Sequence, residues 1–168
     1  HTEIGMISGT PASEMDFHQP SLRRTGYQEA LLDANLDFKP EWVAEADFTV
    51  GGGYHAAKQM LGDPRSAPTA IFCAADEMGF GAIQAARDLG YRVPQDISVI
   101  GMDGHPLGDF YGLSTIDQNP NAQGAKGANM LVDILESGDE KQPVNIEHLT
   151  PWPIEMMVRS STARRARD

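Results

Sequence analysis

The sequence predicts an α/β fold with a doubly wound, mostly parallel sheet. Short β-branched runs alternate with amphipathic helical stretches along most of the chain. This repeated strand–helix–strand spacing favours parallel strands joined by right-handed crossovers, with helices on both faces of the sheet. The chain has 168 residues, of which 40% are hydrophobic and 22% are charged. That size and composition fit a single globular domain.

The first predicted strand covers residues 4–7 and leads through a polar loop to a helix that opens near Pro20. Proline suits the first helical turn because its missing N–H would have no partner there. A second strand is predicted over residues 42–46, and the helix after it ends at residues 62–64. The apolar stripe expected on the first helix consists of Leu22, Gly26, Ala30, Leu31 and Ala34, and that on the second of Tyr54, Ala57 and Leu61.

The third and fourth units have the clearest patterns. Residues 68–74 form an apolar run that is typical of a buried strand, and a helix is predicted from Glu77 to Leu89. Gly90 follows as the glycine expected just after a helix C-terminus. Asp76 is the expected N-cap of this helix. A fourth strand is predicted over residues 97–102.

The pattern changes after residue 103. A loop leads to a short extended run over residues 113–117, and a helix follows with Asn119 as its N-cap and Pro120 as its first residue. Extended runs at residues 144–149 and 154–158 close the predicted sheet. The apolar face expected on the helix that begins at Pro120 consists of Gly124, Ala128, Leu131 and Leu135. The basic tail, residues 164–167, is expected to be solvated.

Composition excludes several classes of function. The 13 basic and 24 acidic residues give a net charge of −11, which repels nucleic-acid backbones, so any DNA-binding part must lie outside these residues. One cysteine, Cys73, excludes a disulfide framework, and no apolar run reaches the roughly 20 residues needed to span a membrane. The five histidines lack metal-ligand spacing. We therefore expect no metal, no cofactor and no membrane partner.

Enzymatic motifs are also weak. The glycine run at residues 51–53 lacks both the Lys-Ser/Thr pair of a phosphate-binding loop and the spacing of a dinucleotide fold, so it is interpreted as a flexible helix entry. No nucleophile elbow exists, and Cys73 lies in a predicted core strand, where a thiol is normally inert. An enzyme is therefore not predicted.

A binding site is expected where the parallel strands end. In an open parallel sheet, ligands bind beyond the carboxyl ends of the strands. Four loops meet this condition, and their mixture of one guanidinium, one exposed aromatic ring and several carboxylates suits a sugar or another polyol. The loops carry Phe17, His18, Gln19 and Arg23 after the first strand, residues 47–49 after the second, Asp76 and Glu77 after the third, and residues 103–105 after the fourth.

Each candidate also has a purely structural explanation. Arg23 could be a solvated helix residue paired with Glu29 or a neighbouring carboxylate, and Phe48 could fasten its loop to the following helix. Asp47 or Thr49 could cap that helix, just as Asp76 could cap the next one. Asp103 is the best single candidate, because a carboxylate at the end of a buried strand must be hydrogen-bonded or reached by solvent.

The helix predicted from Glu77 to Leu89 has two apolar faces. One stripe faces the sheet, whereas Phe80 and Ile83 lie on a different side. The second face is covered either by another layer of the same domain or by a second subunit related by a two-fold axis. The residues predicted at such a dimer interface are Phe80, Ile83, Gln84, Arg87 and Tyr111.

Several segments together resemble one protein family. The run Val-Pro-Gln-Asp-Ile-Ser-Val-Ile-Gly at residues 93–101 and the closing Arg-Ser-Ser-Thr at residues 159–162 are the most specific. They resemble the effector-binding core of LacI/GalR-type transcription regulators, and the match runs nearly end to end in the family's order. The other matching segments are residues 23–31, 47–49, 68–72, 76–82, 102–103 and 113–118.

The resemblance implies a periplasmic-binding-protein-like (type I) clamp of two lobes, of which this chain is an incomplete part. A helix-turn-helix headpiece that binds operator DNA, and most of the first lobe, would be absent from this chain. Residues 1–117 would form the C-terminal lobe, residues 118–143 a crossover and a helix that normally packs on the missing lobe, and residues 144–162 the returning strands. Residues 163–168 would be a disordered tail. The helix over residues 119–136 is expected to pack elsewhere, to swap between chains or to be mobile.

The resemblance also assigns roles to individual residues. Arg23 matches the arginine that holds sugar hydroxyls or an anionic effector, and Phe48 matches the aromatic on which the effector ring stacks. Asp103 matches the carboxylate that accepts from hydroxyls or amines, and Gln118 a residue at the crossover between lobes. The complete expected effector set is Arg23, Phe48, Asp103, Asp76, Gln118, Phe17 and Gln19.

Two positions depart from the family pattern. Ala75 stands where many sugar-responsive members have asparagine, so a direct amide contact to the effector is lost. Gly104 stands where a further acidic residue is frequent.

The predicted function is the ligand-sensing and dimerisation part of a cytoplasmic LacI-type regulator, most simply a repressor. A sugar or related effector would shift the populations of two lobe arrangements and so alter operator binding by the homodimer. Because these residues supply only half the cleft, we expect weak or undetectable effector binding by this chain alone. The alternative is a periplasmic sugar-binding protein of an ABC uptake system, which would share the fold and much of the cleft.

Overall fold

The computed structural model describes residues 1–10, 19–137 and 152–165. These residues form one sheet with the strand order β2-β1-β3-β4-β5-β6. Every neighbouring pair is parallel except β5 and β6, which are antiparallel. The mostly parallel sheet that the sequence predicts is therefore confirmed. The strands are β1 Ile4–Gly9, β2 Val43–Ala46, β3 Ala70–Cys73, β4 Ser98–Met102, β5 Ser114–Asp117 and β6 Glu155–Met157.

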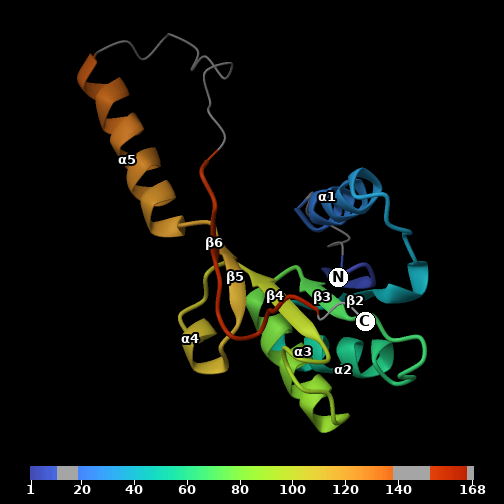
Figure 1. Ribbon diagram of the computed structural model, residues 1–168. Coiled ribbons are helices and arrows are strands. Elements are labelled where there is room, and N and C mark those ends of the chain that lie inside the picture. The colour runs from blue at the N-terminus through green and yellow to red at the C-terminus, as the bar shows by residue number, and fades with distance from the viewer. Residues whose placement is uncertain (11–18, 138–151, 166–168) are drawn as a thin grey trace.

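Helices lie on both faces of the sheet, as a doubly wound fold requires. Helix α1 covers one face, and α2 and α3 lie together against the other (Figure 1). The helices are α1 Gln19–Asp33, η1 Pro40–Trp42, α2 Val50–Met60, α3 Asp76–Asp88, α4 Gly108–Tyr111 and α5 Pro120–Ser137. No helix of the described residues is long and apolar enough to cross a bilayer.

The strand order reverses between β1 and β3. The chain leaves β1 toward β2 on one side, then crosses back over β1 to reach β3 on the other. Ile4 pairs with Ala70 and Ile7 with Cys73, so the two strands end at the same edge of the sheet. In open α/β sheets such a reversal opens a crevice at the carboxyl ends of the two strands.

Helix α1 turns a different stripe to the sheet from the one predicted. Tyr27 and Leu31 are buried, whereas Leu22, Gly26 and Ala30 are exposed. The predicted stripe is therefore wrong apart from Leu31. Tyr27 belongs to the core because its ring packs inward while its hydroxyl donates to the carbonyl oxygen of Ile4 at 2.7 Å.

The glycine run lies at the entry of α2, as predicted, because residues 51–53 form its first turn after the N-cap; its flexibility stays a prediction. A Cβ on Gly53 would lie only 2.4 Å from the Cα of Met78 in α3. Glycine at this position therefore permits the close crossing of the two helices. Thr49 is the N-cap, as one of the two predicted alternatives proposed, and its hydroxyl accepts from the N–H of Gly52 at 2.9 Å.

The second apolar face of α3 is covered by the same chain. Phe80 is 1% exposed and Ile83 is 0% exposed, and the Phe80 ring stacks on Tyr111 with centroids 4.5 Å apart. The prediction that these two side chains meet a second subunit is therefore wrong, and the alternative of a further layer in the same domain accounts for them. Gln84 and Arg87 are exposed, and Tyr111 is half-buried, so their place in an interface stays a prediction.

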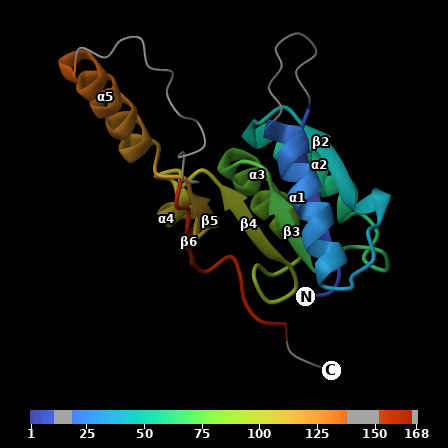
Figure 2. The ribbon, with the colours of Figure 1, turned by 90° about the horizontal axis from the view of Figure 1, so that it is seen from above.

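Helix α5 projects away from the sheet (Figure 2). Asn119 caps it as predicted, since its Oδ1 accepts from the N–H of Ala122 at 3.2 Å. Leu131 is 63% exposed and Leu135 is 67% exposed, so this apolar face does not pack elsewhere on the described part of the chain. Exchange between chains and mobility stay predictions. The predicted extended run at residues 144–149 lies outside the described residues.

The residues after β6 are joined to the sheet. Ser161 inserts between β4 and the start of β5, with its backbone N–H bonded to the carbonyl oxygen of Gly112 at 2.8 Å. Part of the predicted tail is described and contacts the body. Ala163 donates its N–H to the hydroxyl of Ser98 at 3.2 Å, and Arg165 pairs with Glu3 at 3.2 Å.

Candidate functional site

Four of the predicted site residues follow the carboxyl edge of the sheet. Phe48 follows β2, Arg23 reaches from α1 to the end of β3, Asp103 follows β4 and Gln118 follows β5. We call these four residues the rim. The strand reversal between β1 and β3 lies within it, so the rim occupies the part of the fold where ligands are expected.

Arg23 is anchored at the centre of the rim. Its Nη1 donates to the carbonyl oxygen of Ala74, just beyond β3, at 2.7 Å, and its Nη2 lies 3.5 Å from Oδ1 of Asp103. The side chain is only 15% exposed. Its pairing with Glu29, the structural alternative, is not formed. A guanidinium fixed in this way presents its remaining N–H groups in a set direction.

Asp103 is held from two sides. Its Oδ1 accepts from Gln118 Nε2 at 2.6 Å as well as from Arg23. Burial raises the pKa of Asp103 to about 6, Arg23 and Gln118 lower it, and Asp76 and Glu77 raise it. The φ of Asp103 is 118°, a strained conformation for a residue other than glycine. Such strain persists only where surrounding contacts determine the backbone.

Phe48 lies over the carboxyl end of β1. A Cβ on Gly9 would fall within the space of the Phe48 ring, so glycine there lets the tip of the ring approach the strand closely. The ring is 37% exposed, and Phe48 has a φ of 61°. It therefore offers a partly open aromatic surface on the β1 side of the rim, suited to stacking against an apolar face of a ligand.

Asp76 does not act as predicted. The N-cap of α3 is Ala75, without a side-chain bond, and Asp76 is the first helical residue. Asp76 is fully buried, so it is not available for contact with an effector, and its Oδ2 accepts from the N–H of His105 at 2.7 Å. Burial raises the pKa of Asp76, against the opposing effects of Thr115 and His105. Both the capping role and direct effector contact are therefore wrong for this residue.

Two further predicted residues cannot be placed as contacts. Phe17 lies outside the described residues. Gln19 is the first residue of α1, and only its backbone is described. Their contribution to an effector site stays a prediction.

The two departures from the family pattern have structural consequences. Ala75 is buried at the N-terminus of α3, so the small side chain presents no polar group at this point. Gly104 has a φ of 72°, and a Cβ there would lie 2.7 Å from Oδ1 of Asp117. Glycine therefore suits both the backbone conformation and the close approach.

Thr115 is a further residue of the site, to which the sequence alone assigns no role. Its hydroxyl accepts from the N–H of Gly104 at 3.2 Å, so it helps to hold the turn that carries Asp103. Thr115 and Ser114 are both buried in β5. The available signal was two adjacent hydroxyl residues in a strand with apolar neighbours, because buried polar side chains are nearly always hydrogen-bonded.

The described residues do not form a metal centre. No group of three histidine, cysteine or acidic side chains among them is arranged to hold a metal ion. Cys73 is buried, and burial raises the pKa of its thiol, which disfavours the reactive thiolate.

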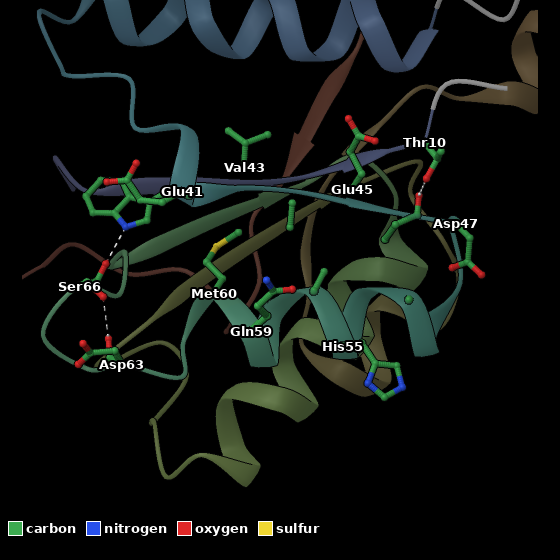
Figure 3. Close-up of a pocket in the computed structure, with 15 residues that line it drawn as sticks. Thr10, Glu41, Val43, Glu45, Asp47, His55, Gln59, Met60, Asp63 and Ser66 are labelled. Atoms are coloured by element: carbon green, nitrogen blue, oxygen red, sulfur yellow. Dashed lines mark hydrogen bonds between the residues drawn. The ribbon is translucent and has the colours of Figure 1, made fainter. Parts of the chain in front are cut away.

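A separate groove lies between β2 and α2 (Figure 3). Its volume is about 790 Å³, and Glu41, Glu45, Asp47 and Asp63 give it an acidic lining. Two of these carboxylates have cationic partners: Arg24 pairs with Glu45 and Arg65 with Asp63. The groove contains none of the four rim residues. It is therefore distinct from the predicted site.

Comparison with known proteins gives a consistent result. Residues 1–162 match the family described as a periplasmic binding protein-like domain. The transcriptional repressor PurR of Photorhabdus laumondii is 39% identical over 149 residues, which cover 87% of this chain and 42% of the repressor. The chain thus spans less than half the length of this curated relative.

Solved structures agree with this match. A LacI-family regulatory protein from Chloroflexus aggregans has a TM-score of 0.81 at 27% identity, over 97% of this chain and 56% of that protein. A lac repressor dimer bound to operator and the anti-inducer ONPF has a TM-score of 0.80 at 27% identity, over 98% of this chain and 54% of the repressor chain.

Proposed function

Because this chain belongs to the periplasmic binding protein-like domain family, as part of a LacI/GalR-type effector-binding core, we propose that it is the ligand-sensing lobe of a transcriptional repressor. The observation that carries the proposal is the rim, in which an anchored arginine, a carboxylate and an exposed ring lie along the strand reversal. The relatives are repressors rather than enzymes or uptake proteins. They favour regulation over the alternative of ABC uptake.

The effector that suits the rim is a neutral molecule rich in hydroxyl groups, such as a sugar. Arg23 already binds the carbonyl oxygen of Ala74 and the carboxylate of Asp103, so its positive charge is largely satisfied. Asp76 and Glu77 add negative charge close to Asp103. An anionic ligand would therefore meet net repulsion from the described residues. Hydroxyl groups can instead donate to Asp103 while the ring of Phe48 covers a C–H face.

The regulator is proposed to act as a cytoplasmic homodimer. The relatives' structures include a repressor dimer on its operator, and the net charge of −11 argues that operator contacts come from outside these 168 residues. Exposed Gln84 and Arg87, together with Tyr111, are the proposed interface residues on this lobe. Effector binding would then shift the population of lobe arrangements and, through the dimer, the affinity for DNA.

The proposal is tested by thermal unfolding of the full-length protein in the presence of neutral mono- and disaccharides, with sugar phosphates for comparison. We expect at least one neutral sugar to raise the Tm, and operator binding measured by fluorescence anisotropy to change with the same sugar. Arg23→Ala and Asp103→Asn should each weaken sugar binding at least tenfold. Arg24→Ala is the matched control, because Arg24 is the next residue and pairs with Glu45 instead of the rim.

Two outcomes would contradict the proposal. One is stabilisation only by anionic sugars, which would overturn the predicted effector class. The other is sugar binding that is unchanged in Arg23→Ala, which would remove the rim from the site.

A further inference from the structure

Asp76 lies at the start of α3 and faces the turn that carries Asp103. Its Oδ2 accepts from the N–H of His105 at 2.7 Å. Its Oδ1 is also buried, and a Cβ on Gly101 would lie 2.1 Å from it. The hydroxyl of Thr115 hydrogen-bonds the same carboxyl group. Burying a carboxyl group costs free energy unless such bonds offset the cost.

The turn after β4 uses Asp76 as a hydrogen-bond acceptor. Asp103 and Gly104 both have positive φ, at 118° and 72°, so three successive N–H groups leave the strand direction and need separate acceptors. Two of the acceptors lie on β5 and the third lies on α3. The three bonds run from Asp103 N to the carbonyl oxygen of Ile116 at 2.9 Å, from Gly104 N to the hydroxyl of Thr115 at 3.2 Å, and from His105 N to Oδ2 of Asp76 at 2.7 Å.

We propose that Asp76 is a positioning residue, which fixes the turn after β4 through the His105 N–H and thereby holds Asp103 against Arg23 and Gln118. Asp76 is fully buried and cannot itself contact an effector. It instead ties the N-terminus of α3 to the rim. The importance of this role for effector binding rests on the proposed function, whereas the bond itself does not.

Electrostatics add a second, separable effect. The charged groups that act on Asp103 are Arg23 from α1, and Asp76 and Glu77 from α3. His105 lies in the same turn, and Asp117 lies against Gly104. Since a negative charge on Asp76 raises the pKa of Asp103, removing that charge should let Asp103 ionise at lower pH.

The test compares Asp76→Asn, Asp76→Ala and Glu77→Gln in this chain by NMR. Hydrogen exchange of the His105 amide reports the bond, and the titration of the Asp103 carboxyl carbon reports the charge. The core amide of Ala74, which donates to the carbonyl oxygen of Ile7 at 2.9 Å, is the internal control for global unfolding.

The variants separate the two effects. In Asp76→Asn the amide oxygen still accepts from His105, so protection should persist while the titration of Asp103 moves to lower pH. In Asp76→Ala the His105 amide should exchange at least tenfold faster, with Ala74 unchanged. Glu77→Gln should leave His105 protection intact, because Glu77 makes no bond to the turn.

Either of two results would overturn the proposal. The first is an unchanged His105 exchange rate in folded Asp76→Ala. The second is a loss of His105 protection in Asp76→Asn, which keeps the acceptor oxygen and so keeps the test decisive if the alanine variant does not fold. Neither measurement uses an effector, so their failure is distinct from failure of the proposed function.

Discussion

The hydroxyl of Ser161 donates to the carbonyl oxygen of Val99 at 2.6 Å. The same hydroxyl accepts from the N–H of Ser114 at 2.8 Å, and the backbone of Ser161 accepts from the N–H of Val99 at 2.8 Å. One residue near the end of the chain thus joins β4 to β5. The Arg-Ser-Ser-Thr segment, which the sequence offered only as a mark of resemblance, therefore has a structural reason.

Ser161→Ala should destabilise the chain by roughly 2 to 3 kcal/mol, because a buried N–H and a buried carbonyl group lose their partner together. Ser160→Ala is the control: Ser160 is exposed, and its loss should change the free energy of unfolding by about 0.5 kcal/mol or less. Urea unfolding followed by circular dichroism measures both. Equal effects of the two substitutions would refute the bridging role.

Gly53→Ala should destabilise the chain by about 2 kcal/mol, since the added methyl group would meet the backbone of Met78 across the α2–α3 crossing. Gly51→Ala tests the same chemistry two residues earlier in the same helix. Its new methyl group meets nothing closer than 3.8 Å, so the better helix propensity of alanine should stabilise the chain by about 0.5 kcal/mol. In the same thermal unfolding assay, Gly53→Ala should lower the Tm and Gly51→Ala should raise it. An unchanged Tm in Gly53→Ala would show that the two helices can move apart at little cost in free energy.

Phe80→Ala should cost roughly 3 to 5 kcal/mol of stability, because a fully buried ring leaves a cavity. The unfolding midpoint should fall equally at low and high protein concentration, since the ring packs within one chain. Phe48→Ala should cost only about 1 kcal/mol, because its ring is partly exposed. If Phe80→Ala instead lowers the unfolding midpoint more at low protein concentration than at high, Phe80 lies at a subunit interface.

Asp103 should make stability depend on pH in an uncommon direction for a carboxyl group. Burial raises its pKa from 3.8 to about 6, so the folded chain binds this proton more tightly than the unfolded chain does. The resulting stabilisation is complete below pH 3.8 and is lost as the pH rises through about 6. The free energy of unfolding of the wild type, taken relative to Asp103→Asn, should therefore fall between pH 4 and pH 7. A relative rise over that interval would mean that Arg23 outweighs burial.

Local sequence was sufficient for the architecture. Strand and helix order, the caps at Thr49 and Asn119, and the glycine after α3 all depend on residues within one or two turns of each other. The carboxyl-edge rule then placed Arg23, Phe48 and Asp103 along one side of the sheet. Parallel strands end at a common edge whatever their side chains are, so this much follows from strand order alone.

Side-chain partners were decided by the tertiary structure. Arg23 meets Ala74 across 51 positions of sequence and Asp103 across 80, while His105 meets Asp76 across 29. No periodicity records such distances, so the sequence alone predicts Asp76 as a helix cap, leaves two alternatives open for Phe80 and gives Tyr27 no place in the core. Local residue patterns specify which segments become strands and helices and at which edge of the sheet the strands end. Only the packed fold decided which buried polar groups satisfy one another, because that depends on which distant segments come into contact.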